Sequence, residues 1–141
     1  MLVNKTYIRV RYADTDKMQF VYNGKYLEYF EVGRTELLRT IGLPYRSIEE
    51  LGFQLPVLES HIIYRNPGRY DDLLEIEASV NQLPRPKIHI DYVVRRSGTD
   101  EVLAEGYTEH VFMREDTKKA VRPPRFYIDA LLPYLAEERV K

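Results

Sequence analysis

One long amphipathic helix stands among segments that otherwise alternate as strands, and this contrast constrains the fold more than any other feature. Seven residues recur at intervals of three and four, the spacing of one helical face; they are Tyr26, Tyr29, Phe30, Gly33, Leu37, Leu38 and Ile41. A helix over 24–41 is about 27 Å long. Asn23 is the expected N-cap, and Gly42 is the expected left-handed residue after the helix.

The rest of the chain reads mainly as strands. One is predicted before the helix, at Thr6–Tyr12, and four follow it, at Val57–Arg65, Leu73–Gln82, Lys87–Arg95 and Val102–Arg114. Turn signals at 66–68, 84–86 and 97–100 allow consecutive strands to pair. Short helices are expected over about 45–51 and after Pro123-Pro124. The order predicts an α+β fold in which a five-stranded, mostly antiparallel sheet wraps around the long helix.

Composition narrows the class of protein. The 141 residues favour a single domain over 1–141, and a net charge of −1 gives no general attraction to nucleic acid. The absence of cysteine excludes disulfides, thiolate catalysis and sulfur-based metal sites. The three histidines lack metal-ligand spacing, so no metal is expected. We find no signal-peptide pattern and no apolar run near ~18 residues, so we expect a cytoplasmic protein without a membrane segment.

Two carboxylates lie between the first strand and the long helix, in Asp14-Thr15-Asp16. Free amide protons and the positive end of the helix dipole stabilise an oxygen on which negative charge develops, as when a thioester carbonyl is attacked. A nearby carboxylate can act as a nucleophile or as a general base for water. The alternative is that both acids only cap turns or the helix.

These residues also carry a resemblance to a known family. Asp14-Thr15-Asp16, followed by Val21-Tyr22-Asn23, Tyr26, Glu31 and Arg34, resembles the signature of the 4-hydroxybenzoyl-CoA thioesterase-like hotdog-fold proteins, which include the Tol-Pal-associated acyl-CoA thioesterases. Residues 64–73 are similar to the family's segment that leads into its third strand. The resemblance covers about Tyr7 to Arg114 and implies the hotdog fold and hydrolysis of an acyl-CoA thioester. That reaction needs no cofactor.

The resemblance also implies roles for individual residues. Asp16 is the implied catalytic carboxylate, and its action as nucleophile or as general base stays open. Main-chain amides near Tyr22, Asn23 and Gly24 are implied to polarise the thioester carbonyl. Gln19 stands where many relatives have glycine, which leaves the size of the acyl group open. The implied supporting residues, of which Glu31 and Arg34 are expected to pair or to brace the loop, are Asp14, Tyr26, Glu31 and Arg34.

Binding of coenzyme A requires cations for its phosphates. The candidates are Arg65, Arg69, Arg85 and Lys87, and for each the alternative is a solvated surface residue. His61 is expected to be structural, with the lining of an acyl pocket as its alternative.

Three functional hypotheses follow from the sequence. The first is an acyl-CoA thioesterase that forms a homodimer or tetramer, because the fold leaves sheet edges open, with its site at a subunit interface. The second is a non-catalytic module that binds or scaffolds acyl thioesters. The third is hydration or dehydration of an acyl thioester, which relies on an Asp–His or similar pair that the sequence does not place. Thioesters on acyl carrier protein are an alternative substrate to free acyl-CoA.

Overall fold

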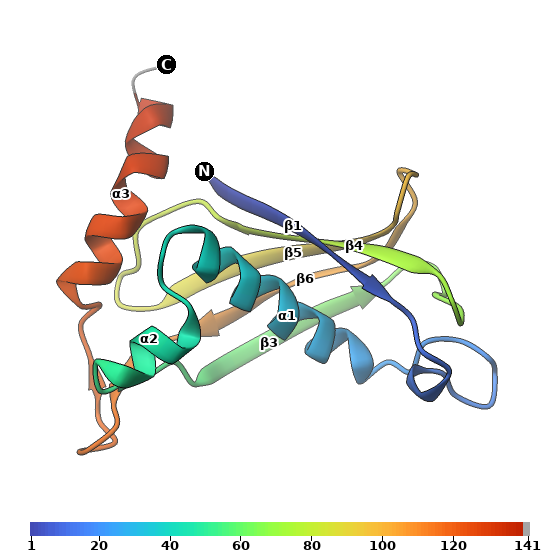
Figure 1. The fold of residues 1–141 in the computed structure, drawn as a ribbon, viewed down its shortest axis with the longest axis horizontal. Helices are drawn as coiled ribbons and strands as arrows, with labels where there is room; N and C mark the ends of the chain where they lie inside the picture. The colour runs from blue at the N-terminus through green and yellow to red at the C-terminus, as the bar shows by residue number, and fades with distance from the viewer. Residues whose placement is uncertain (140–141) are drawn as a thin grey trace.

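A computed structural model shows a five-stranded antiparallel sheet curved around one long helix, as predicted (Figure 1). It describes the backbone of residues 1–139 and the side chains of residues 1–135, so residues 140–141 of the predicted domain lie outside the described residues. The strand order is β1-β4-β5-β6-β3. The sheet and its helix consist of β1 (Leu2–Arg9), α1 (Lys25–Thr40), β3 (Val57–Tyr64), β4 (Leu73–Val80), β5 (Ile88–Arg96) and β6 (Val102–His110).

Helix α1 buries the face that the sequence predicts, and only its outermost member, Ile41, is half-exposed. Gly42 follows the helix with φ +77°, the left-handed conformation that glycine adopts without strain. The N-terminal prediction is wrong, because the N-cap is Gly24 and no side chain caps the helix. The chain enters α1 through a tight turn instead, in which the Lys25 amide donates to the Tyr22 carbonyl at 2.9 Å.

The contact between α1 and the sheet is close. Phe30 stacks on Tyr92 of β5 with ring centroids 4.2 Å apart. One turn further on, Gly33 lies against β4, and a Cβ atom there would meet the Ile76 Cγ2 at 2.8 Å. A small residue at position 33 therefore sets how near the helix axis can come to the strands.

The predicted strand over Val102–Arg114 is divided in two. β6 ends at His110, and β7 (Phe112–Arg114) leaves the large sheet to join β2 (Phe53–Gln54) and β8 (Ala120–Val121) in a separate three-stranded sheet. Phe112 is fully buried there, in edge contact with Phe53 at 6.0 Å. Burial of this aromatic pair on the small sheet explains why β7 turns away.

Three further helical segments complete the described chain: η1 (Tyr12–Asp14), α2 (Tyr45–Glu50) and α3 (Arg125–Arg139). Helix α3 is longer than the short helix expected, and it lies beyond the far end of the sheet from the 10–24 segment (Figure 1). No helix in the part of the chain that the structure describes is both long and apolar enough to cross a membrane.

Candidate active site

Asp16 lies in a tight loop that leads directly into α1. Thr15 and Val21 form an antiparallel bridge that closes this loop, and the Asp16 amide donates to the Phe20 carbonyl at 2.9 Å. Gln19 at the tip has φ +67°, a conformation that glycine adopts far more easily. The backbone conformation of the turn therefore explains the glycine that the resemblance implies at this position.

The half-buried Asp16 carboxylate shapes the loop with one of its oxygens. Its Oδ1 accepts hydrogen bonds from the Met18 amide at 2.9 Å and from the Phe20 amide at 3.4 Å. No described residue donates to Oδ2. One oxygen is thus fixed by the backbone, and the other is available to a bound water or a substrate.

Asp14 differs sharply from Asp16, because it is only 2% exposed and is surrounded by donors. Its carboxylate accepts from the Arg11 amide at 3.1 Å, the Arg11 guanidinium at 3.0 Å and the Tyr29 hydroxyl at 3.1 Å. Burial alone would raise the pKa of Asp14, but the hydrogen bonds from Arg11 and Tyr29 hold that pKa below its usual value. Asp14 is a charged anchor that ties η1 to α1.

The start of α1 presents unused amide protons. The Tyr22 amide already donates to the Asp14 carbonyl at 2.8 Å, which removes it from the predicted set of carbonyl-polarising donors. The amides of Asn23 and Gly24 have no acceptor among the described residues, and both residues are exposed. Two free donors therefore lie at the positive end of the helix dipole, immediately after the loop that carries Asp16.

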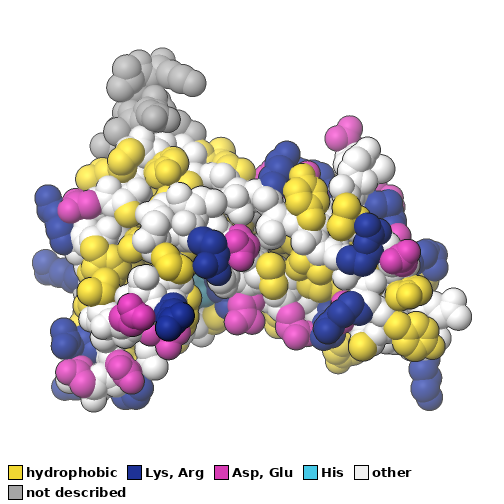
Figure 2. Space-filling view, in the orientation of Figure 1, with side chains coloured by type: hydrophobic (Ala, Val, Ile, Leu, Met, Phe, Trp, Pro, Cys, Tyr) yellow, Lys and Arg dark blue, Asp and Glu magenta, His cyan; other side chains and the backbone are white. Residues whose placement is uncertain are grey.

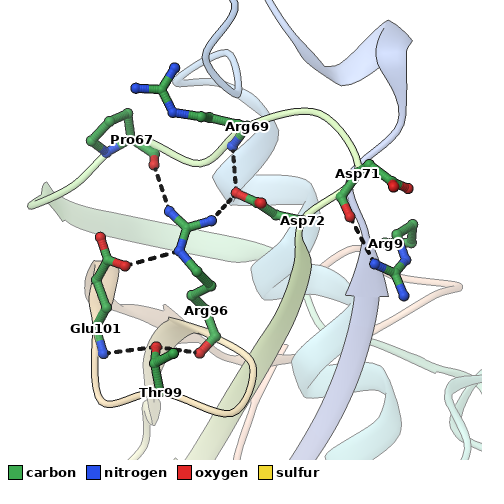
Figure 3. A network of polar contacts seen from close by, with 8 residues as sticks. All are labelled: Arg9, Pro67, Arg69, Asp71, Asp72, Arg96, Thr99 and Glu101. Atoms are coloured by element: carbon green, nitrogen blue, oxygen red, sulfur yellow. Dashed lines mark hydrogen bonds and ion pairs between the residues drawn. The ribbon is translucent and has the colours of Figure 1, made fainter.

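A second loop, 67–72, supports the first. The Val21 amide donates to the Gly68 carbonyl at 2.8 Å, and the Arg69 guanidinium lies 4.8 Å from the centroid of the Phe20 ring. Figure 3 shows how Arg96 holds this second loop: its guanidinium contacts the Asp72 carboxylate, donates to the Pro67 carbonyl at 3.2 Å and pairs with Glu101 at 2.9 Å.

Sequence reasoning did not single out Arg96. Its role depends on the side-by-side position of the start of β4 and the end of β5, where Leu74 pairs with Arg96. Only the strand register reveals that an arginine at the end of one strand faces the loop before another.

The predicted supporting residues do not gather at one place. Tyr26 is buried, and its hydroxyl approaches the backbone of Gly68, so it joins α1 to the second loop. Glu31 and Arg34 lie one to three turns further along α1, where both line a cavity that does not include Asp16. No ion pair joins them within 4 Å. The expectation that they pair or brace the loop is therefore wrong, because both side chains line this cavity and not the Asp16 loop.

The four predicted coenzyme A cations are likewise divided. Arg65 and Arg69 lie at the Asp16 end of the sheet, where Arg65 pairs with Glu105 at 2.7 Å. Arg85 and Lys87 lie at the other end, where both line a polar hollow beyond β4 that also contains His89 and Glu109. Since β4 has eight residues, about 26 Å of strand separates the two pairs within one chain.

The three histidines also lie apart from Asp16. His61 and His89 are on the outer face of the sheet, each stacked on Tyr107. His61 is exposed there and lines neither the cavity beside Arg34 nor the hollow beside Arg85. His110 is buried on the inner face and hydrogen-bonds to Thr108 at 2.8 Å.

The arrangement at the start of α1 suits attack on a carbonyl group. It combines a half-buried carboxylate, held by the backbone through one oxygen, with two free amide donors and a second loop that is held by hydrogen bonds. Such donors stabilise the oxyanion of a tetrahedral intermediate, while the carboxylate supplies the nucleophile or activates water.

Comparison with known proteins agrees with this chemistry. A model of the Thioesterase-like superfamily matches residues 10–132. A putative esterase from Aquifex aeolicus is 29% identical over 123 residues, which are 87% of this chain and 93% of that protein. A putative acyl-CoA thioesterase from Bacillus subtilis, YneP, is 43% identical over 72 residues, but the match spans only 51% of this chain and 52% of YneP.

Solved structures give the same result over nearly the whole chain. A hypothetical protein from Thermus thermophilus, TT1821, is 34% identical with a TM-score of 0.83, and the match covers 92% of this chain and 95% of TT1821. The DHNA-CoA thioesterase from Staphylococcus aureus is 28% identical with a TM-score of 0.88, covering 99% and 93% of the two chains. The chain therefore belongs to the Thioesterase-like superfamily and has its hotdog fold.

Proposed function

We propose that this protein hydrolyses acyl-CoA thioesters to a free acid and coenzyme A, with Asp16 as the catalytic carboxylate. Several relatives are named acyl-CoA thioesterases, which supports the reaction class. The observation that carries the assignment to this site is that one short segment, 16–24, holds both an Asp16 oxygen without a described donor and the unused amides of Asn23 and Gly24. Asp14 is excluded from the catalytic role because its oxygens are occupied and buried.

In the proposed hydrolysis, the site first polarises the thioester carbonyl, and the carbonyl carbon is then attacked. The thioester carbonyl oxygen accepts hydrogen bonds from the two free amides, so that negative charge develops at the end of the helix dipole. Asp16 either attacks the carbonyl carbon, giving an acyl anhydride that water then hydrolyses, or removes a proton from an attacking water. In both routes the carbon–sulfur bond breaks and coenzyme A leaves as the thiolate, which then takes up a proton.

The complete site needs a second copy of the chain. Edge strand β3 is exposed along nearly its whole length, including Leu58, Ile63 and Tyr64, and it offers unpaired backbone groups to another strand. Two β3 strands that pair antiparallel would place the β4–β5 end of one subunit near the Asp16 end of the other. Arg85 and Lys87 of one chain then join Arg65 and Arg69 of its partner around one coenzyme A.

The cytoplasmic location expected from the sequence stays a prediction, and so does membership of the Tol-Pal-associated type; the identity of the acyl group stays open. An acyl-carrier-protein substrate and a non-catalytic acyl-thioester-binding module are the competing functions. The module would retain the amide donors but would not need the accessible oxygen of Asp16, so that oxygen favours catalysis.

The test is release of free coenzyme A from short, long, branched and aromatic acyl-CoAs, with the same acyl groups on acyl carrier protein in parallel. Turnover of at least one acyl-CoA supports the proposal. Turnover confined to the carrier-protein thioesters would reassign the substrate. Binding of acyl-CoA without hydrolysis would establish the binding module instead.

A further inference from the structure

A cavity of about 350 Å³ lies inside one protomer, between the C-terminal half of α1 and the inner face of the sheet. Its walls are mostly apolar, with Leu38, Leu55, Val80 and Ile90 among them. It is formed at the end of the molecule near α2 and α3, where apolar side chains gather on the face seen in Figure 2. Asp16, Asn23 and Gly24 do not line it, so it is separate from the candidate active site.

Arg34 brings a positive charge into this apolar space. It is half-buried, and its charge acts on the buried Tyr92 hydroxyl, where it opposes the rise in the pKa of Tyr92 that burial causes. No carboxylate of residues 1–135 lies within 4 Å of that guanidinium. A guanidinium partly removed from water is costly without a counter-charge, and its planar donors match the two oxygens of a carboxylate.

Three buried polar side chains near Arg34, those of Tyr92, Thr108 and His110, already have hydrogen-bond partners. Tyr92 Oη and Thr108 Oγ1 are 2.7 Å apart, Thr108 Oγ1 and His110 Nε2 are 2.8 Å apart, and His110 Nδ1 lies 3.3 Å from the Leu55 carbonyl. Because that carbonyl can only accept, His110 Nδ1 carries the proton and Nε2 accepts from Thr108, which in turn accepts from Tyr92. These bonds use the donors of all three side chains, whereas no hydrogen bond or ion pair to a described residue occupies the donors of the Arg34 guanidinium.

We propose that this cavity binds an apolar monocarboxylate, with its carboxylate on Arg34 and its chain along the apolar walls. The volume is at the lower end of the range for small-molecule sites. At about 30 Å³ for each small group at liquid density, it holds about a dozen heavy atoms, the size of decanoate. Glu31 lines the same cavity and is exposed, so it stands where the ligand enters and opposes the charge of the ligand.

Titration calorimetry of decanoate into the full-length protein tests this site directly, without any need for turnover. We expect one decanoate per chain. Arg34→Gln should weaken binding at least tenfold, whereas Glu31→Gln should tighten it severalfold because a like charge is removed. Arg39→Gln, which changes an exposed arginine on the same helix, is the matched control and should bind as the wild type does. Uncharged 1-decanol should bind at least tenfold more weakly than decanoate.

Two further variants keep the test decisive. Arg34→Lys keeps the positive charge and serves if Arg34→Gln fails to fold. It should bind decanoate more tightly than a folded variant with an uncharged residue at position 34. Leu55→Trp fills the cavity and should abolish binding. Absence of decanoate binding, equal binding of decanol, or undiminished binding by Arg34→Gln or Leu55→Trp would overturn the proposal. Leu55→Trp blocks only the cavity, so decanoate bound at the Asp16 site would still bind to this variant. The test of the cavity is therefore independent of the test of the proposed hydrolysis.

Discussion

At the scale of single residues, the sequence Asp14-Thr15-Asp16 holds two acids with opposite environments. Asp14 is enclosed by Arg11, Tyr29 and the main chain, while Asp16 keeps one oxygen free of any described donor. The difference comes from the backbone, because η1 turns the first side chain toward α1 and the following loop turns the second toward its own amides. Two acids only two residues apart thus differ in role: Asp14 is a buried anchor, and Asp16 is the proposed catalytic carboxylate.

The amide of Gly24 can be tested by removing its proton alone. Gly24 has φ −65°, which matches the value that proline fixes, so Gly24→Pro deletes the N–H with little change in φ. Gly24→Ala is the matched control, because it adds a Cβ near the exposed Tyr22 ring but keeps the N–H. We expect kcat to fall about 10²-fold in the proline variant and only slightly in the alanine variant. Equal kcat values for the two variants would show that this amide does not polarise the carbonyl.

His110 makes stability depend on pH. Burial, with the nearby Arg34 charge, lowers the pKa of His110 to about 4, from 6.5 in the unfolded chain. The unfolded state binds more protons between these values, so stability falls as pH falls through 6.5 toward 4, by roughly 3 kcal/mol at most. The pKa of His89 is raised by its bonds to Glu109 and Asp91 against the effect of burial, and it acts in the opposite direction.

The measurement is urea unfolding of wild type and His110→Gln between pH 7 and pH 4. Since His89 and the carboxylates are common to both proteins, the difference between the curves isolates His110. We expect the wild type to lose more stability than the variant. Parallel curves would mean that His110 takes up its proton at the same pH in the folded and unfolded protein, which would contradict a lowered pKa.

At the scale of elements, the distance between α1 and the sheet decides where both the loop and the cavity lie. Phe30 stacks on Tyr92, and Gly33 fits against Ile76 with no room for a methyl group. The same helix presents free amides at its first turn and Arg34 to the cavity two to three turns later. The position of α1 therefore affects both the candidate active site and the cavity.

Gly33→Ala should destabilise the protein by about 1–3 kcal/mol, because the added methyl group meets the stiff Ile76 side chain. On an open helix face the same change would stabilise by up to about 1 kcal/mol, since alanine favours helix over glycine. The sign of the change in unfolding free energy therefore shows whether α1 packs closely against β4 at position 33. A gain in stability would show that the helix is not held this close to β4.

At the scale of the whole molecule, an exposed β3 and the division of the four cations between two ends of the sheet both favour an even-numbered oligomer. Leu58→Lys places a charge on this edge and should shift the protein toward monomer at micromolar concentration, with loss of kcat/KM for acyl-CoA. Val3→Lys, on the opposite edge strand β1, is the control and should leave the mass unchanged. Light scattering reports the mass. A wild-type monomer with full activity would contradict an interfacial site.

Much of this architecture follows from patterns in the sequence. The apolar face of α1 and the alternation in β4 and β5 predict which residues are buried, because helix and strand periods are local properties. The N-cap of α1 and the division of the predicted strand Val102–Arg114 are not determined by local sequence. They depend on hydrogen bonds from the Asp16 loop and on the burial of Phe112 against Phe53, which are residues far apart in the chain. The positions of Glu31, Arg34 and Arg96 likewise depend on which strands lie beside them.

The most direct test of the account is the rate of coenzyme A release by Asp16→Asn, a nearly isosteric change that removes the carboxylate charge. The control is Asp116→Asn, which alters an exposed aspartate after β7. With folding checked by circular dichroism, we expect the Asp16 variant to lose at least ~10²-fold in kcat and the control to lose nothing. A folded Asp16→Asn protein that hydrolyses acyl-CoA at the wild-type rate would contradict the assignment of Asp16 as the catalytic carboxylate.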